Sequence, residues 1–285
     1  MVNERSWNAG QLSFDEIGYW TEIKLDIVKD YAKEYSTILA KKPFQYAYID
    51  GFAGSGVHLS RDTQEFVLGS PLNALKIKPP FHEYFLVDLD GDKVEQLRSF
   101  PEIKDRPEVH VIHGNCNQVL LEEVFPKVKF EDYRRALCVL DPYGLQLNWE
   151  VIEVAGRMKS IEIFLNFPIM DMNRNALWRK PELASQEGRV RMTAFWGNES
   201  WLNAAYQQQT TLFGDDEAIK LGNKQVVDAF SDRLKKVAGF KYVPEPIPMR
   251  NSMNAVIYYL FFASQQPVAS TIVDYIFKKY QNRGA

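Results

Sequence analysis

The 285 residues are 46% hydrophobic and 25% charged, which excludes a disordered chain and supplies enough apolar side chains for one or two folded domains. The formal net charge of -3 excludes a protein that coats nucleic acid through charge alone, although it leaves room for a local basic groove. The chain has only two cysteines, Cys116 and Cys138, and no apolar stretch of signal-peptide or membrane-spanning length, so we expect a cytoplasmic protein.

The first predicted element is an amphipathic helix that ends near Ala40. Apolar and aromatic residues recur along it at helical spacing, and Ser13 or Asp15 is placed to cap it. Residues 1–40 are therefore expected to pack as a helix on the rest of the molecule. Lys24 falls outside the apolar pattern. Its side chain, like those of Tyr19 and Thr21, is a candidate to reach over the cofactor cleft, but we expect Lys24 to lie in solvent.

The first predicted strand, 45–50, runs into a glycine-rich turn, where the backbone can approach a ligand closely. The glycine order G-x-x-G-x-G lacks the Gly-Lys-Ser/Thr of a phosphate loop and does not match the G-x-G-x-x-G of dinucleotide-binding folds. It fits the turn that holds the methionine part of S-adenosylmethionine in methyltransferases, although a purely structural turn is an alternative. The residues predicted to bind this cofactor here are Asp50, Gly51, Phe52, Gly54 and Gly56.

The next two predicted strands, 83–88 and 109–112, also end in polar residues. Asp88 directly follows an apolar run, and a carboxylate there can accept hydrogen bonds from the ribose hydroxyls of a nucleoside. Asp90 is placed either to assist it or to cap the following helix. Asn115 comes after the second of these strands, where an amide can read the adenine edge. Both Asp88 and Asn115 are predicted to bind the cofactor.

The fourth predicted strand, 135–141, leads into Asp141-Pro-Tyr-Gly144, which is the most specific motif in the chain. Asp141 and the carbonyl next to Pro142 can accept hydrogen bonds from an exocyclic amine and hold its lone pair toward an electrophilic methyl group, while Tyr143 stacks on the ring. Alignment of this kind supplies most of the rate of a methyl transfer. The alternative is a turn that leads into a helix and serves no chemistry.

A fifth predicted strand, 161–166, ends in Asn166, which we place on the far side of the same cleft. The strand rhythm then stops, and residues 171–238 are predicted to form a mainly helical insertion or cap. Basic and aromatic residues interleave in it, a composition that suits phosphates and unstacked bases but equally a solvated helix. They are Arg174, Trp178, Arg179, Lys180, Arg189, Arg191 and Trp196.

Residues 239–285 return to the sheet. The prolines of 242–248 predict an edge strand or an extended segment, and the apolar run 255–263 predicts a strand that pairs with it in antiparallel fashion. A helix at 268–280 closes the chain. Arg250 precedes the last strand and is predicted to face the substrate. Strands that alternate with helices predict an α/β fold with a mostly parallel sheet covered on both faces.

The order of glycine loop, acidic residue, polar residue and D-P-Y-G resembles class I methyltransferases. That resemblance implies a Rossmann-like sheet in residues 41–170 and 239–285, mostly parallel with an antiparallel C-terminal hairpin. D-P-Y-G looks like the D/N-P-P-Y/F/W motif of amino-group DNA and RNA methyltransferases, but it lacks the second proline. It is closer to the D-P-F-G of tRNA guanine-N2 methyltransferases, which leaves the target atom open.

Segments along nearly the whole chain resemble the three-Cys-motif partner family, whose members are regarded as methyltransferase-like proteins of bacteria and archaea. The resemblance implies a separate partner protein with a three-cysteine motif reminiscent of radical S-adenosylmethionine enzymes. The segments that carry it are 18–25, 48–56, 69–71, 141–144, 248–252 and 258–264.

We therefore expect an S-adenosylmethionine-dependent enzyme that methylates an amino group, with a nucleobase of RNA or DNA as the target. The alternative is a subunit that binds the cofactor but acts only through its partner. A nicotinamide-dependent oxidoreductase shares the fold class but not the glycine order. We predict no metal site, because His110 and His113 point to opposite faces of a strand.

Overall fold

The computed structural model describes residues 15–210 and 216–281, so the proposed cap Ser13 and most of the segment before the first helix lie outside the described residues. None of the helices in these two ranges is both long and apolar enough to cross a membrane. The helices are α1 (Tyr19–Leu39), α2 (Ser70–Leu75), α3 (Gly91–Arg98), α4 (Cys116–Val119), α5 (Trp149–Met158), α6 (Ile169–Asn175), α7 (Gln186–Trp196), α8 (Trp201–Ala205), α9 (Asn223–Lys236) and α10 (Pro267–Tyr280), with short non-α turns at Leu120–Val124, Phe125–Lys127 and Pro181–Leu183.

A seven-stranded sheet forms the centre of the molecule, in the order β11-β12-β8-β7-β2-β5-β6. The five strands from β8 to β6 are parallel, whereas β12 runs antiparallel to both β8 and β11. The predicted α/β fold, a Rossmann-like and mostly parallel sheet with an antiparallel C-terminal pair, is confirmed. The strands are β2 (Gln45–Asp50), β5 (Glu83–Asp88), β6 (Val109–His113), β7 (Arg134–Leu140), β8 (Ile161–Phe167), β11 (Ile247–Arg250) and β12 (Val256–Ala263).

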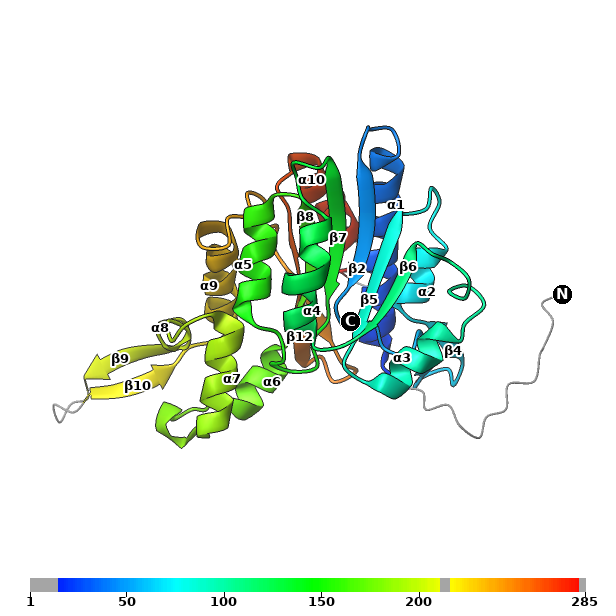
Figure 1. Ribbon diagram of the computed structural model, residues 1–285. Coiled ribbons are helices and arrows are strands. Elements are labelled where there is room, and N and C mark those ends of the chain that lie inside the picture. Colours follow the sequence, from blue (N-terminus) through cyan, green and yellow to red (C-terminus); the bar gives the residue numbers. More distant parts are fainter. Residues whose placement is uncertain (1–14, 211–215, 282–285) are drawn as a thin grey trace.

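Helices cover both faces of this sheet, as Figure 1 shows: α4 and α5 lie on one side, and α1 and α10 on the other. Alternate residues of one strand serve the two cores, because side chains of a strand point to opposite faces. In β2, Ala47 and Ile49 join the core beneath α5, while Tyr46 and Tyr48 join the core beneath α1. Because both faces are covered, the middles of the strands are mostly apolar. One exception is Glu162 of β8, whose carboxyl accepts hydrogen bonds from the Tyr31 and Ser264 hydroxyls.

Two small sheets lie outside the main one. Strand β1 (Asp15–Ile17) pairs in parallel with β3 (Val57–Ser60), which pairs with β4 (Phe66–Leu68), so this sheet sits directly after the glycine-rich turn. Strands β9 (Tyr206–Thr210) and β10 (Asp216–Lys220) form an antiparallel hairpin that projects from the end of the molecule (Figure 1). The sequence pattern had indicated helix in this last segment and no strand at Asp15.

Candidate functional site

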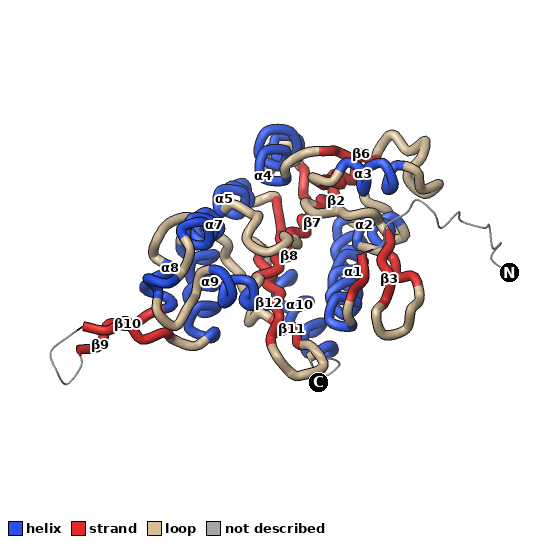
Figure 2. The backbone as a smooth tube through the Cα atoms, turned by 90° about the horizontal axis from the view of Figure 1, so that it is seen from below, coloured by secondary structure: helices blue, strands red, loops and turns tan. Residues whose placement is uncertain are grey.

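A cleft runs along the carboxyl ends of the parallel strands. Strands β2 and β7 are neighbours, yet the chain leaves β2 toward β5 and leaves β7 toward β8. Ligands of open α/β sheets bind in the crevice that such a reversal creates. Figure 2 views the molecule from below and shows α1 and β3 on one side of the strand ends and β8, β11 and β12 on the other.

The cleft consists of two adjoining cavities of about 570 Å³ each. The first, the glycine-loop half, is lined by Gly51, Gly54, Asp88 and Asn115 among others. The second, the α1 half, is lined by residues of α1, β8, β12 and α6. Asp141 and Tyr143 border both halves, so the D-P-Y-G turn stands where they meet.

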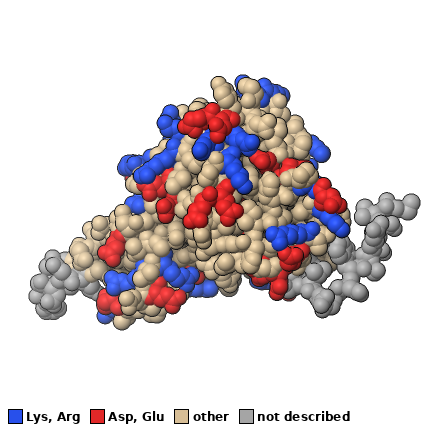
Figure 3. Space-filling view, viewed as in Figure 1, with Lys and Arg blue, Asp and Glu red and all other residues tan. Residues whose placement is uncertain are grey.

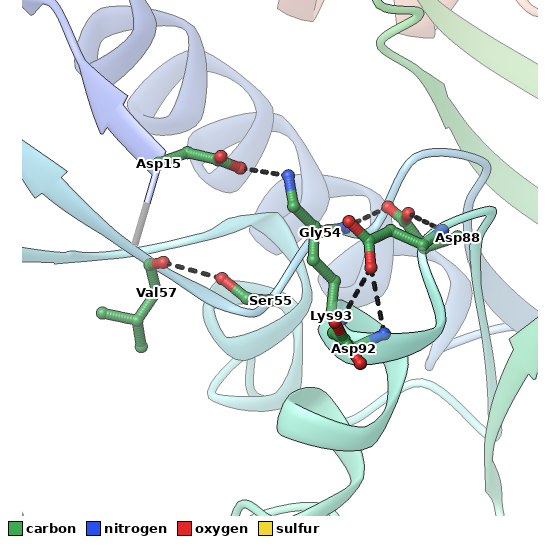
Figure 4. A network of polar contacts seen from close by, with 8 residues as sticks. Asp15, Gly54, Ser55, Val57, Asp88, Asp92 and Lys93 are labelled. Atoms are coloured by element: carbon green, nitrogen blue, oxygen red, sulfur yellow. Dashed lines mark hydrogen bonds and ion pairs between the residues drawn. The ribbon is translucent and has the colours of Figure 1, made fainter. Parts of the chain in front are cut away.

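Asp88 holds the glycine loop and the following turn at the same time. Its Oδ2 accepts a hydrogen bond from Gly54 N at 2.7 Å, and its Oδ1 accepts one from Asp90 N at 2.9 Å (Figure 4). Gly54 has a φ of +62°, and the nearest atom to an added Cβ would be His58 Cε1 at 3.9 Å. At Gly54 the loop therefore exposes its backbone to the glycine-loop half. The half-buried carboxylate of Asp88 lies beside it.

Asp50 and Gly56 belong to the predicted loop but do not line the cleft. Asp50 is fully buried, and it accepts hydrogen bonds from Phe52 N at 3.2 Å and Ser70 Oγ at 2.5 Å. Burial raises the pKa of Asp50 to about 7, although these two hydrogen bonds oppose the shift. The carbonyl of Gly56 accepts from Gly69 N at 2.8 Å. Both residues fix the shape of the turn.

Asn115 lies at the far wall of the glycine-loop half. Its Oδ1 accepts a hydrogen bond from Asn117 N at 2.9 Å and so caps α4. Asn117 in turn donates to Gln146 O at 2.9 Å and accepts from Asn148 N at 2.7 Å, which ties this wall to the loop after Tyr143. The Asn115 side chain is exposed to the cleft.

Asp141 is held from two sides. Asn166 Nδ2 donates to its Oδ1 at 2.7 Å, and the Lys24 ammonium forms an ion pair with its Oδ2. The Lys24 side chain is 9% exposed and the Asp141 side chain 31%. Our expectation that Lys24 lies in solvent is therefore wrong: α1 packs with this face on the cleft, and the ammonium lies 5.5 Å from the centre of the Tyr258 ring.

Tyr143 is the most exposed large hydrophobic side chain among the described residues, with 85% of its surface accessible. The turn after it is tight, because Gly144 has a φ of +62°. Pro142 and Asn166 line the α1 half beside it. Arg250 does not line either half; its guanidinium donates to Asn254 O at 2.9 Å in the turn between β11 and β12.

Sequence reasoning passed over two further groups of the cleft, Lys93 and His58. Lys93 reaches back from α3 to Asp15 of β1, with Nζ 2.5 Å from Oδ2 (Figure 4). Burial works to lower the pKa of Lys93, but the Asp15 carboxylate outweighs it, so that the pKa is raised. Burial, and then the Lys24 ammonium, lower the pKa of His58. Both residues lie in segments without a recognisable motif.

No family model and no curated protein matches the sequence. Among solved structures, the chain is similar to protein LPL1258 from Legionella pneumophila str. Philadelphia 1, of the family DUF519, with a TM-score of 0.53 and 12% identity over 92% of this chain and 94% of that chain. The plantazolicin methyltransferase BpumL in complex with SAH gives a TM-score of 0.36 and 9% identity over 86% of each chain. At such identity the likeness to LPL1258 concerns the fold alone.

Proposed function

We propose that this protein is an S-adenosylmethionine-dependent methyltransferase that acts on an amino nitrogen of a nucleobase. One observation carries the proposal: Gly54, Asp88, Asn115 and Asp141, which are far apart in sequence, line one cleft at the reversal point of the sheet. A glycine loop and an acidic strand end are the groups by which α/β folds of this kind hold a nucleoside.

The glycine-loop half suits this cofactor. A volume of about 570 Å³ lies within the range of small-molecule and cofactor sites. Each oxygen of Asp88 accepts one backbone hydrogen bond, and an ionised carboxylate has room for further donors such as ribose hydroxyls. An added Cβ at Gly54 would enter the space beside His58, where the methionine part would lie. When bound, S-adenosylmethionine supplies an electrophilic methyl group.

The α1 half offers a hydrogen-bond donor directly beside an acceptor. Asp141 can accept from an exocyclic amine and orient its lone pair, while the Lys24 ammonium has protons left after its bond to Asp141. A nucleobase edge on which an amine stands next to a ring nitrogen is complementary to this pair. Tyr143 is placed to stack on such a base.

Calorimetry with S-adenosylmethionine tests the cofactor assignment, with reduced nicotinamide dinucleotide as the control ligand. We expect binding to the wild type and a loss of about 10- to 100-fold in affinity for Asp88→Ala, because a hydrogen bond to a charged group contributes about 1.5–3 kcal/mol. Asp88→Asn keeps an acceptor for Gly54 N and is expected to lose less. A folded wild type that binds no S-adenosylmethionine would refute the proposal.

A second candidate is a subunit that binds the cofactor and acts only with a partner, a three-Cys-motif protein. It is favoured by the fact that both Asp141 oxygens already accept hydrogen bonds from this chain. Transfer of tritiated methyl groups to total cellular RNA and DNA separates the two candidates. The enzyme predicts labelled product that Asp141→Ala abolishes, whereas the silent subunit predicts cofactor binding without product until the partner is added.

A further inference from the structure

The mouth of the cleft carries two arginines that the proposed cofactor and target contacts do not use. Arg174 of α6 lines the α1 half, and Arg191 of α7 lines the glycine-loop half. Tyr143 borders both halves of the cleft, so it lies where the half with Arg174 meets the half with Arg191. We call Arg174, Arg191 and Tyr143 the rim.

The rim arginines differ from the other cations of the cleft in how they are neutralised. Lys24 and Lys93 each form a close ion pair with a carboxylate. Arg191 has its nearest acids, Asp171 and Glu187, at 4.0 Å, beyond hydrogen-bond distance. Arg174 is exposed and forms no ion pair within the described part of the chain. Their guanidinium donors therefore remain available to an anion.

Arg191 is positioned against the D-P-Y-G turn itself. A Cβ added to Gly144 would lie 3.3 Å from Arg191 Nη2 and 2.8 Å from Asp171 Oδ2, so the guanidinium rests on the turn that follows Tyr143. Asp171 is fixed by its own helix, because its Oδ1 accepts from Asn175 Nδ2 at 2.8 Å. An anion bound by Arg191 would thus lie next to whatever stacks on Tyr143.

More basic and aromatic groups lie on the segment of chain between the two rim arginines. Trp178 is 43% exposed, and its indole nitrogen donates to the carbonyl of Arg174 at 3.0 Å. Arg179, Lys180 and Arg189 are exposed on the same segment. On the face of the molecule shown in Figure 3, basic and acidic side chains are mixed. This face therefore carries no broad positive surface that would attract a nucleic acid by charge alone.

We infer that the rim binds a single strand of nucleic acid, with phosphates on Arg174 and Arg191 and the target base stacked on Tyr143. This rests on the proposed function, whose substrate it names. Positive grooves with aromatic platforms are the usual grip on single strands. A base inside a duplex cannot reach such a cleft without being flipped out. The exposed cations of the segment between Arg174 and Arg191 add to the charge that a free nucleotide would need.

Fluorescence anisotropy with a labelled RNA of ~12 nucleotides, without cofactor, tests the inference. We expect the single strand to bind more tightly than its duplex. Arg174→Gln/Arg191→Gln should weaken binding about tenfold at 0.1 M salt and reduce the slope of log K against log salt by about 1.4, or about 0.7 for each lost phosphate contact. Tyr143→Ala should weaken binding about tenfold, through lost stacking, and leave this slope unchanged.

Arg157→Gln is the matched control, since Arg157 is an exposed arginine at the far end of α5 that pairs with Glu153. A duplex bound as tightly as the single strand, no binding at all, or equal losses in the rim and control variants would overturn the inference. Calorimetry with S-adenosylmethionine on the same samples keeps the two proposals apart. If the protein binds S-adenosylmethionine but its RNA binding does not depend on the rim, only the inference about the rim is refuted. If RNA binding depends on the rim but S-adenosylmethionine does not bind, only the proposed methyltransferase function is refuted.

Discussion

The Lys24 ammonium and the Asp141 carboxylate meet although 117 residues separate them in the sequence. Lys24 stands three residues before Ile27 and seven before Tyr31, so helical spacing puts it on the buried face of α1. The expectation of a solvent-exposed side chain rested on the charge of the lysine and left out the carboxylate with which it pairs. Asp88 and Asp141 were easier to place. Asp88 is the last residue of β5 and Asp141 directly follows β7, and the carboxyl ends of parallel strands share one edge. The residues at the ends of strands can thus be predicted from the sequence. The side chain that a distant helix brings into contact with them cannot.

Replacement of Lys24 by methionine removes the ammonium and keeps the length of the side chain. We expect Lys24→Met to lower the free energy of unfolding by about 1–2 kcal/mol; the loss stays below the full penalty of a broken buried pair because Asp141 is 31% exposed. Urea unfolding measures it. The double variant Lys24→Met/Asp141→Asn no longer has an unpaired charge, so it should be less destabilised than the sum of the two single variants. A loss of stability equal to that sum would contradict the ion pair.

Asp50 predicts a pH dependence of stability. Its pKa is about 7 in the fold against the ordinary 3.8 of an aspartate, so between these pH values the folded chain holds a proton that the unfolded chain has released. Stability therefore falls as pH rises from about 4 to 7, by at most about 4 kcal/mol from this group. Urea unfolding at about pH 5 and 8 should show a smaller fall in Asp50→Asn than in the wild type. Parallel curves would contradict this role.

At the scale of elements, strand assignments from sequence agree with the structure where apolar runs are bounded by polar residues. The predicted strand 45–50 coincides with β2, and the predicted strand 83–88 coincides with β5. The hairpin β9–β10 escaped prediction because Tyr206–Thr210 has a run of glutamines in place of alternating apolar residues. Its strands are specified by backbone pairing with each other, which composition does not reveal.

The glycine loop allows a matched comparison. Gly54 and Gly239 both have positive φ values, +62° and +85°, and an added Cβ clashes with nothing at either position. Gly54→Ala and Gly239→Ala should each lose about 1–2 kcal/mol of stability from the backbone conformation. Only Gly54→Ala should also lose S-adenosylmethionine affinity in calorimetry. Equal affinities in the two variants would show that the loop does not contact the cofactor.

At the scale of the whole molecule, α1 and α10 depend on each other because both pack into the same core on one face of the sheet. Phe277 of α10 is buried in the core beneath α1, whereas Tyr275 of the same helix is 73% exposed. Outside the core, Lys279 Nζ pairs with Asp30 of α1 at 2.7 Å. The sequence predicted both helices, since each has an apolar stripe, but not that they would pack on each other.

Phe277→Ala should therefore lower the free energy of unfolding by about 3 kcal/mol or more, as large-to-small changes in cores do. Tyr275→Ala should stay within about 0.5 kcal/mol of the wild type. Thermal and urea unfolding of the two variants measure the difference. Similar stabilities would mean that α10 is not an integral part of the core.

The wall of the α1 half joins the two ends of the chain: Thr21 and Lys24 come from the first helix, Tyr258 from the last strand, and the Tyr258 hydroxyl donates to the Trp20 carbonyl at 3.1 Å. A ribosome releases these pieces in order, so the nascent polypeptide has its glycine turn long before that wall exists. Fragments that end before Tyr258, through premature termination or proteolysis, would likewise lack this wall. Whatever chemistry the cleft performs is therefore reserved for chains whose synthesis has passed Tyr258.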